Sequence, residues 1–353
     1  MFSATYSVPS GTAVYKLTFQ FSSGESRSCT VEMGAPHQSY AMPPQGSLVG
    51  FTTDASGRLM TGVWKSVWSV PQGQGGPLPG GKWEFMEVPT DFVVTGGGAV
   101  GAEFPNGAFL TNLQQAGSDV WETTTLQLQS QDAYIHEAHA IAMKIEGLTH
   151  AELKAATSWI QASGTTAAHP SVSLSAPSGW LVTGGGGLTS RYLVGQYLTV
   201  SAPVLRIVIA CLPGVSPPGC QTVYAADGWR VSAKDHIVAS PAHARVEVYL
   251  IQPEFIIAGQ RYQVAQSVKF ATSAVAGHPS VAVSGTQGQF ALTGVGASVD
   301  WQSYGWAGNM LWKLLPRPDI AGAEAASKDH TYSSPATVTA YAIGLKLVPI
   351  PFD

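Results

Sequence analysis

The feature that most constrains this chain of 353 residues is a segment that occurs three times along it. The best-preserved copy reads Ser-Lys-Asp-His at residues 327–330, and a second copy reads Ala-Lys-Asp-His at 233–236. A more divergent copy begins at 130–133, where Ala133 replaces the histidine. Because self-similarity of this kind is the signature of repeat architectures, we expect a fold built from one unit used three times.

Each copy also opens with a shared pattern, in which an aromatic residue is followed by two residues, a threonine and a glycine cluster. The pattern occurs at 92–98, 180–186 and 290–296. Neither a Gly-Lys-Ser/Thr sequence nor a helix is expected after these glycines, which excludes a P-loop and a dinucleotide fingerprint. A tight bend or a β-bulge between strands explains the glycines most simply. Close approach to a ligand, or a backbone nest for an anion, is the alternative.

The size and pattern of the repeats predict an all-β protein. A unit of roughly 90 to 105 residues with several short strands has the size of a small sandwich or a prism blade. The alternating Val338, Ala340 and Ala342 of the last strand predict that the unit faces pair into a shared core. One helix is expected after Thr149, since Thr149 and Glu152 have the spacing of a capping box.

A Gly/Pro-rich run at 72–81 predicts a linker and gives the clearest domain boundary. Upstream of it, residues 14–21 alternate with period two, a turn follows at Gly24, and residues 28–32 run back, which predicts a hairpin. We therefore divide the chain into an N-terminal β domain (1–75), a linker (76–88) and three repeat units (89–150, 151–252 and 253–353).

The N-terminal domain combines an alternating strand at 14–21 with a turn and a later Val-Gly-Phe segment at 49–51. This combination resembles one Greek key of the jacalin-like β-prism lectins, in which the Val-Gly-Phe segment leads into a sugar-contacting loop. The resemblance is confined to residues 1–75 and implies a β-prism-like fold for them. The family's aspartate after the second turn falls near Met60, so its sugar site is not carried over.

A second set of motifs is most complete in the last unit. It consists of a glycine turn at 294–296, Gly-Asn-Met-Leu at 308–311, Ser-Lys-Asp-His at 327–330 and Ala-Tyr-Ala-Ile-Gly at 340–344. This set resembles a tandem repeat of uncharacterised bacterial proteins, and the resemblance extends over all three units. It implies a bacterial origin and carries no established activity.

The charge of the chain excludes some classes of partner. Charged residues make up 11% of the sequence, against about 25% in an average protein, so the surface is built mainly from hydroxyls, amides and backbone. Such composition is typical of β-rich proteins outside cells. We expect an extracellular or cell-surface location, although the sequence does not open with a signal peptide. The net charge of −4, without a Lys/Arg cluster, argues against nucleic acid. No apolar run is long enough for a transmembrane helix.

The cysteines and histidines give no metal or cofactor site. Cys211 and Cys220 flank a turn-rich loop, so they form either a small disulfide or two buried thiols, and both readings stay open. His136 and His139 stand three apart in a segment expected to be a strand, where such positions point to opposite faces. We therefore expect no bound metal, and the absence of a cofactor fingerprint predicts no cofactor.

The candidate ligand-binding residues are the Asp-His pairs of the second and third copies and the aromatic loop after residue 300. An aspartate that orients a histidine can bind sugar hydroxyls or a metal, and the structural alternative is a turn. Exposed aromatic side chains stack on sugar rings, and the alternative for them is core packing. The predicted site residues are Trp301, Tyr304, Trp306, Asp235, His236, Asp329 and His330.

These observations favour a non-enzymatic binding protein with lectin-like recognition of glycans or another cell-surface ligand. A bacterial toxin component that acts on host membranes is a second hypothesis, with residues 245–271 as its membrane-inserting segment. A structural or assembly subunit of a fibre, shell or appendage is a third, and self-association of the chain is left open. No catalytic triad, nucleophile elbow or Cys/His arrangement is present in the sequence, so we expect no enzyme and no catalytic residues.

Overall fold

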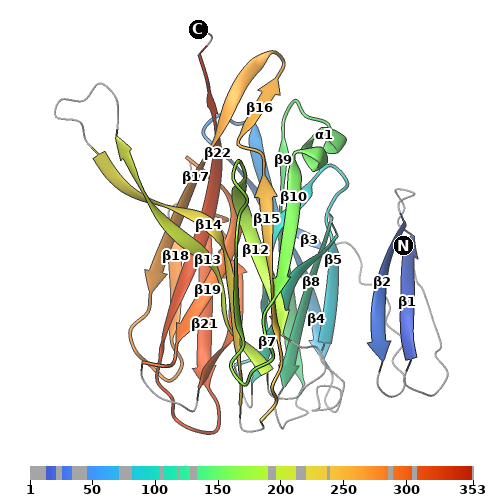
Figure 1. Cartoon of the computed structure of the whole chain (residues 1–353), viewed down its shortest axis with the longest axis vertical. Coiled ribbons are helices and arrows are strands. Elements are labelled where there is room, and N and C mark those ends of the chain that lie inside the picture. The colour runs from blue at the N-terminus through green and yellow to red at the C-terminus, as the bar shows by residue number, and fades with distance from the viewer. Residues whose placement is uncertain are drawn as a thin grey trace. The chain divides into compact units, whose positions relative to one another are not determined.

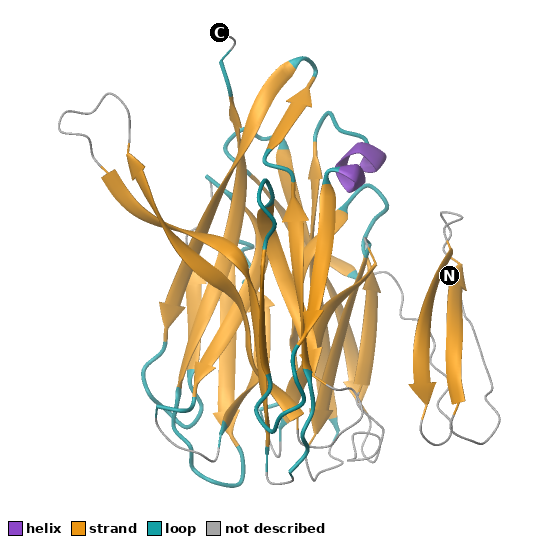
Figure 2. Ribbon diagram, viewed as in Figure 1, coloured by secondary structure: helices purple, strands orange, loops and turns teal. Residues whose placement is uncertain are grey.

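In the computed structural model, the described part of the chain is built almost only from β-strands (Figures 1 and 2), with 72% of the described residues in strands and 2% in helix. This content confirms the all-β prediction. The chain divides into two compact units, Met1–Pro44 and Gln45–Asp353. The described residues are 13–20, 26–33, 46–70, 82–103, 107–117, 119–127, 133–189, 196–211, 220–236, 239–284, 289–303 and 308–351.

The small unit contains the predicted hairpin. Strand β1 (Ala13–Gln20) pairs with β2 (Ser26–Met33) in an antiparallel register that runs from Ala13 opposite Met33 to Gln20 opposite Ser26. The alternating residues of this segment therefore form the hairpin that their period predicts.

The described strands of the large unit form three antiparallel sheets, of six, seven and seven strands. Sheet I has the order β10 (Thr157–Ser163), β15 (Ala244–Ile251), β12 (Leu181–Thr189), β7 (Ala108–Gly117), β8 (Val120–Gln127) and β5 (Lys82–Glu87). Sheet II has the order β11 (Ser171–Ser175), β14 (Cys220–Asp235), β13 (Gln196–Cys211), β19 (Ala291–Asp300), β22 (Thr337–Pro349), β17 (Gln260–Thr272) and β16 (Glu254–Ile257). Sheet III has the order β18 (Ser280–Ser284), β21 (Gly322–Asp329), β20 (Asn309–Pro316), β6 (Val93–Val100), β9 (Tyr134–Ile145), β4 (Leu59–Val70) and β3 (Ser47–Thr53).

The pairings show that each repeat consists of six corresponding strands with an extra hairpin strand in two of them. The last strand of each repeat (β9, β15 or β22) pairs with the first of the six corresponding strands (β4, β10 or β17) and with the glycine strand (β6, β12 or β19). Strands β3 and β16 occupy matching places beside β4 and β17. The first repeat therefore begins with β3, whereas we expected it at residue 89, after an N-terminal domain and a linker. The first strands of this repeat, β3 and β4, carry none of the repeated motifs. Only the pairing of β4 with the distant β9 shows that they belong to the repeat.

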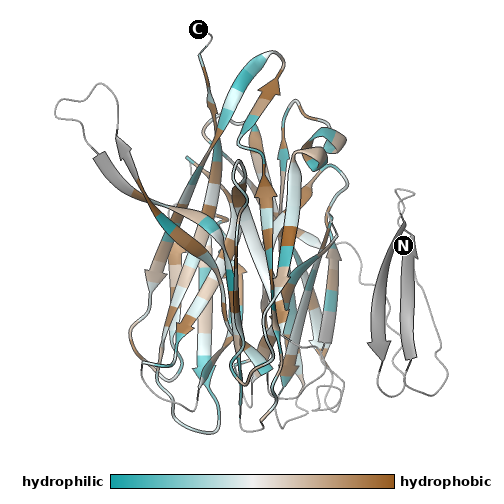
Figure 3. Cartoon of the chain, viewed as in Figure 1, coloured by the Kyte–Doolittle hydropathy of each residue, from teal (hydrophilic) through white to brown (hydrophobic). Residues whose placement is uncertain are grey.

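Each repeat contributes strands to two sheets, so that each sheet joins two repeats. The pairings between repeats follow a cycle. The glycine strand β12 of the second repeat pairs with β7 of the first, β6 of the first pairs with β20 of the third, and β19 of the third pairs with β13 of the second. One buried core accordingly contains Val94, Val182 and Leu292, one from each repeat. Figure 3 shows hydrophobic residues along the strands of all three sheets. The three repeats form one pseudo-threefold body with a shared core, as the alternating strands predict.

The glycine clusters lie at β-bulges near the centre of this arrangement. In each repeat the strand register shifts at the threonine of the shared pattern, as between Val182 and Gly184, which confirms the bulge prediction. The Thr95 hydroxyl donates to the Thr293 carbonyl over 2.7 Å. A Cβ on Gly294 would lie 2.7 Å from the carbonyl oxygen of Thr183. These glycines are needed because the three bulges pack directly against one another.

One short helix, α1 (His150–Ala155), follows β9, and its start confirms the predicted capping box. The Thr149 hydroxyl accepts a hydrogen bond from the Glu152 amide at 3.2 Å, and the Glu152 carboxylate accepts one from the Thr149 amide at 2.7 Å. Within the described parts of the chain, no helix has the length and apolar character needed to cross a membrane.

Candidate ligand-binding site

The two Asp-His motifs lie at the ends of β14 and β21, and the fold brings them together. His236 Nε2 and His330 Nδ1 are 3.2 Å apart, although the residues are separated by 94 positions in the chain. The imidazole rings are in edge-to-face contact, with their centroids 5.2 Å apart. Because strands of the second and third repeats pair in sheet II, the two Asp-His motifs form one composite cluster.

The aspartates of this cluster hold the loops that follow them. Asp329 Oδ2 accepts a hydrogen bond from the Ser334 amide at 3.0 Å, and Asp235 Oδ2 accepts the corresponding bond from Ser240 at 3.5 Å. The histidine of each upstream His-Pro-Ser-Val segment contacts the other oxygen, so that His278 Nε2 lies 3.2 Å from Asp329 Oδ1. The same set of contacts in two repeats gives both aspartates a structural role in the turn.

The lysines of the motifs connect neighbouring repeats. Lys234 Nζ lies 4.7 Å above the centre of the Trp301 ring, from the third repeat. Lys328 Nζ lies 5.7 Å from the centre of the Phe109 ring and donates to the Glu103 carbonyl, both in the first repeat. Burial lowers the pKa of Lys234 to about 8 and also lowers the pKa of Lys328. Cation–π contacts of this kind stabilise the junctions between repeats.

Trp301 is held inside this cluster and is only 7% exposed. One side of its ring faces Lys234, and the His169 ring packs edge-on at a centroid distance of 5.3 Å. Its ring is therefore a packing element of the repeat junction. Tyr304 and Trp306, the other aromatic residues of the predicted site, lie outside the described residues.

The two histidines of β9 point to different environments. His136 is buried, with Nε2 2.9 Å from the Thr123 hydroxyl and Nδ1 2.8 Å from the Thr125 hydroxyl. His139 Nε2 lies 3.2 Å from Glu137 Oε2, and this hydrogen bond is the main reason that the pKa of Glu137 falls to about 2. Across the described ranges, no group of three or more His, Cys, Asp or Glu side chains is placed to hold a metal ion.

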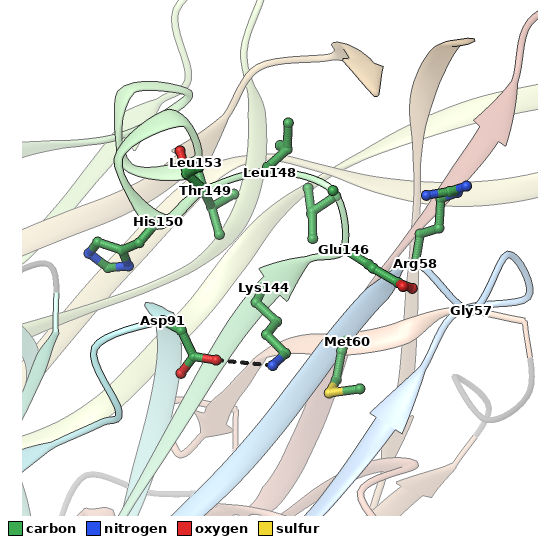
Figure 4. A pocket seen from close by; sticks show the side chains of 12 residues that line it. Gly57, Arg58, Met60, Asp91, Lys144, Glu146, Leu148, Thr149, His150 and Leu153 are labelled. Atoms are coloured by element: carbon green, nitrogen blue, oxygen red, sulfur yellow. Dashed lines mark hydrogen bonds and ion pairs between the residues drawn. The ribbon is translucent and has the colours of Figure 1, made fainter. Parts of the chain in front are cut away.

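A pocket of about 470 Å³ lies beside α1, at the turn between β3 and β4 and at the end of β9 (Figure 4). Figure 4 shows Lys144 directed toward Asp91, and the two charged groups are 3.0 Å apart. Arg58 and Glu146 lie on another side, and the apolar Leu153 of α1 also lines the pocket. The pocket offers paired charges, and the Thr149 hydroxyl at its edge is engaged in the helix cap through the Glu152 carboxylate. Sequence reasoning missed it because its lining comes from separate turns and the helix.

A second set of candidate positions lies opposite the glycine that stands three residues after the threonine of each shared pattern. His139, Glu247 and Tyr341 stand opposite Gly98, Gly186 and Gly296 and are therefore structurally equivalent. Their strand neighbours toward the edge of each sheet are also equivalent. These neighbours are Lys65, Gln161 and Phe270.

The face around Glu247 is a buried polar network. Glu247 is 1% exposed and accepts hydrogen bonds from the Tyr249 hydroxyl (3.1 Å) and the Gln115 amide (3.3 Å). Its other oxygen lies 3.2 Å from Arg245 Nη2. Desolvation by burial is the largest influence and raises the pKa of Glu247 to about 7. The network ties β15 to β7 across the glycine strand between them.

The face around Tyr341 is aromatic and rich in hydroxyls. The Phe270 ring lies 5.8 Å from the Tyr341 ring and 5.1 Å from the Tyr224 ring, measured between centroids. The hydroxyls of Ser298 and Tyr341 are 3.2 Å apart. Phe270 remains 41% exposed. This cluster could not be predicted from the sequence, since each of its three rings comes from a different strand.

Comparison with known proteins does not add an assignment. No protein-family model matches the chain, and no curated protein sequence matches it.

Proposed function

We propose that this chain is a non-enzymatic binding protein with lectin-like recognition of glycans or another cell-surface ligand. The observation that carries the proposal is the composite cluster at the ends of β14 and β21, where His236 and His330 meet at 3.2 Å. Trp301 packs into this cluster, and the segment that contains Tyr304 and Trp306 follows it three residues later. Loops from two repeats are thus anchored side by side, as a shared recognition surface requires.

The hydrogen-bonding of the cluster favours binding over catalysis. Asp235 and Asp329 each accept a backbone hydrogen bond that fixes the following loop, and each contacts the histidine of an upstream segment. A nucleophilic site needs its carboxylate to orient a base toward a reacting group. Here each carboxylate contacts a histidine and also holds the main chain of the following loop, which suits rigid loops that present other side chains to a ligand.

An assembly role is the second candidate, and one observation favours it. Strand β3 is at the edge of sheet III and exposes Leu48, Val49 and Phe51, the last to 50%. An edge strand with apolar side chains is a template for pairing with another chain. The toxin hypothesis receives less support, because residues 245–271 form β15, β16 and β17, and Val246 and Val248 are buried in the core.

The test is a glycan array probed with the purified chain, together with its molar mass from light scattering. Retention on one class of sugar, with displacement by the free sugar, is the expected result. Trp306→Ala should weaken binding and change the melting temperature by no more than a few degrees. A blank array together with a large, regular assembly would replace the proposal with the assembly role.

A further inference from the structure

The aromatic-hydroxyl face of sheet II is the surface with the clearest ligand chemistry in the described residues. It consists of side chains from four strands that meet where β17, β22 and β19 pair and where β14 crosses β17. Its central ring is Phe270, with the two tyrosines on either side. The face is defined by Tyr224, Phe270, Tyr341, Ser298, Thr272 and Thr339.

The two equivalent faces carry other side chains at the positions of Phe270 and Tyr341. In sheet III, Lys65 and His139 both contact the Glu137 carboxylate, at 3.3 and 3.2 Å. In sheet I, Glu247 is enclosed by Arg245 and Tyr249. Charged groups in these two faces bond to one another. In sheet II both of the equivalent positions are aromatic, Phe270 and Tyr341, and the Phe270 ring stays accessible.

Hydroxyl groups border the exposed ring. Thr272 and Thr339 are cross-strand partners whose hydroxyls are 2.9 Å apart, and the Ser298 and Tyr341 hydroxyls form a second pair. Each hydroxyl has one donor and two acceptor sites, so a hydroxyl pair retains capacity for further hydrogen bonds. A partly exposed ring with such a border matches a sugar, which has an apolar C–H face and a rim of hydroxyls.

The face is also continuous with the composite cluster through the strands of sheet II. Ser298 and Thr339 are paired in the register, and Asp300 and Thr337 are paired two residues further along the same strands. Trp301 comes directly after Asp300. The distance from Tyr341 to Thr337 is four residues, or about 13 Å along a strand. A chain of several sugar units could therefore contact both regions.

We propose that the aromatic-hydroxyl face binds the ring of a neutral sugar, with Phe270 as the stacking residue and the threonine and serine hydroxyls as hydrogen-bonding partners. This inference rests on the proposed function, since it names a site for the same class of ligand. It differs from that proposal in placing a principal contact on strands and not on the loops.

The test compares variants in titrations with the neutral oligosaccharide that the wild-type chain binds best on an array. Phe270→Ala should weaken binding about tenfold, a loss typical of a central aromatic contact. Trp159→Ala is the matched control, because Trp159 is also an exposed aromatic residue on a strand, at the edge of sheet I. Trp159→Ala should bind the oligosaccharide with the affinity of the wild type.

Three outcomes would overturn the inference, and they are distinguishable. If Phe270→Ala binds as the wild type does while Trp306→Ala binds weakly, the sugar site lies in the loops and the proposed function stands. If the wild type binds no oligosaccharide on the array, the proposed function fails as well. If Phe270→Ala instead lowers the molar mass in solution, the face is an interface between copies of the chain.

Discussion

The faces around Glu247 and Tyr341 occupy equivalent places in sheets I and II but have opposite chemistry. Both residues stand opposite the glycine three residues after the threonine of the shared pattern, in strands that pair with equivalent bulges. Glu247 is enclosed in a polar network, whereas Tyr341 belongs to an aromatic surface with an exposed ring at its centre. The comparison teaches that the glycine bulges and strand pairings define the scaffold, and that the outer side chains of each repeat are free to change.

The largest expected effect on stability comes from the glycine clusters, which occur at equivalent places in both sheets. A Cβ at Gly186 would overlap with the Leu113 carbonyl oxygen of the neighbouring repeat. Gly186→Val should therefore lose more than about 4 kcal/mol of stability and fail to fold, since a backbone atom cannot move aside. Thermal unfolding and solubility measure this. Gly179→Ala is the control, because it is strained only by a φ of +83° and should cost about 1 kcal/mol. Equal melting temperatures for the two variants would contradict the scaffold account.

The next effect concerns the junction of the second and third repeats. Trp301 is buried against Lys234 and His169, so Trp301→Ala should cost about 3 kcal/mol through the cavity that it leaves. Chemical denaturation measures this loss. Trp301→Phe should recover a good part of it. A variant that keeps its stability but loses sugar binding would show that Trp301 contacts ligand directly.

The Glu247 face should make the stability depend on pH. Burial raises the pKa of Glu247 from 4.5 to about 7, so the folded chain holds this proton more tightly than the unfolded chain. The corresponding stability, about 3 kcal/mol, is fully present below pH 4.5 and is lost as the pH rises through 7. Glu247→Gln should flatten this change between pH 5 and pH 8 in urea unfolding.

A matched carboxylate variant controls for the loss of one charge in that experiment. Glu254 is at the surface, where its carboxylate lies near Arg261. Glu254→Gln should leave the pH profile of the wild type in place. If Glu247→Gln keeps the same profile too, the buried network is not the source of the pH dependence.

The smallest effect on stability and affinity is expected for a variant of the aromatic-hydroxyl face. Tyr341→Phe removes a hydroxyl that pairs with Ser298 and leaves the ring in place. Its stability should change by less than about 1 kcal/mol, because the half-buried site lets water replace the bond. Its affinity for sugar should fall only a few-fold. Calorimetric titration measures this, and a loss as large as that of Phe270→Ala would shift the main contact from the ring to the hydroxyl.

Local patterns predicted the elements of this fold, and long-range pairing decided their arrangement. The alternation at 14–21, the Thr149–Glu152 cap and the glycine bulges are all read from neighbouring residues, and the structure contains each of them. The pairing of β12 with β7 has no local signature, since it depends on which apolar faces meet. For the same reason, β4 and β5 were expected outside the first repeat.

The candidate site was likewise predictable from the sequence only in part. The repeated Asp-His motifs pointed to two equivalent loops, and the fold joins them at His236 and His330. The burial of Trp301 was not predictable, because it results from Lys234 of another repeat. Phe270 could not be selected either, since only the folded register sets it apart from an ordinary strand residue.

The most direct test of the account is a side-by-side titration of Phe270→Ala and Gln161→Ala with the same neutral oligosaccharide. The two residues occupy equivalent positions, opposite Tyr341 and Glu247, and both are exposed. We predict that Phe270→Ala binds about tenfold more weakly than the wild type and that Gln161→Ala binds as the wild type does. Equal affinities for both variants would contradict the claim that one repeat face has been specialised for ligand binding on a common scaffold.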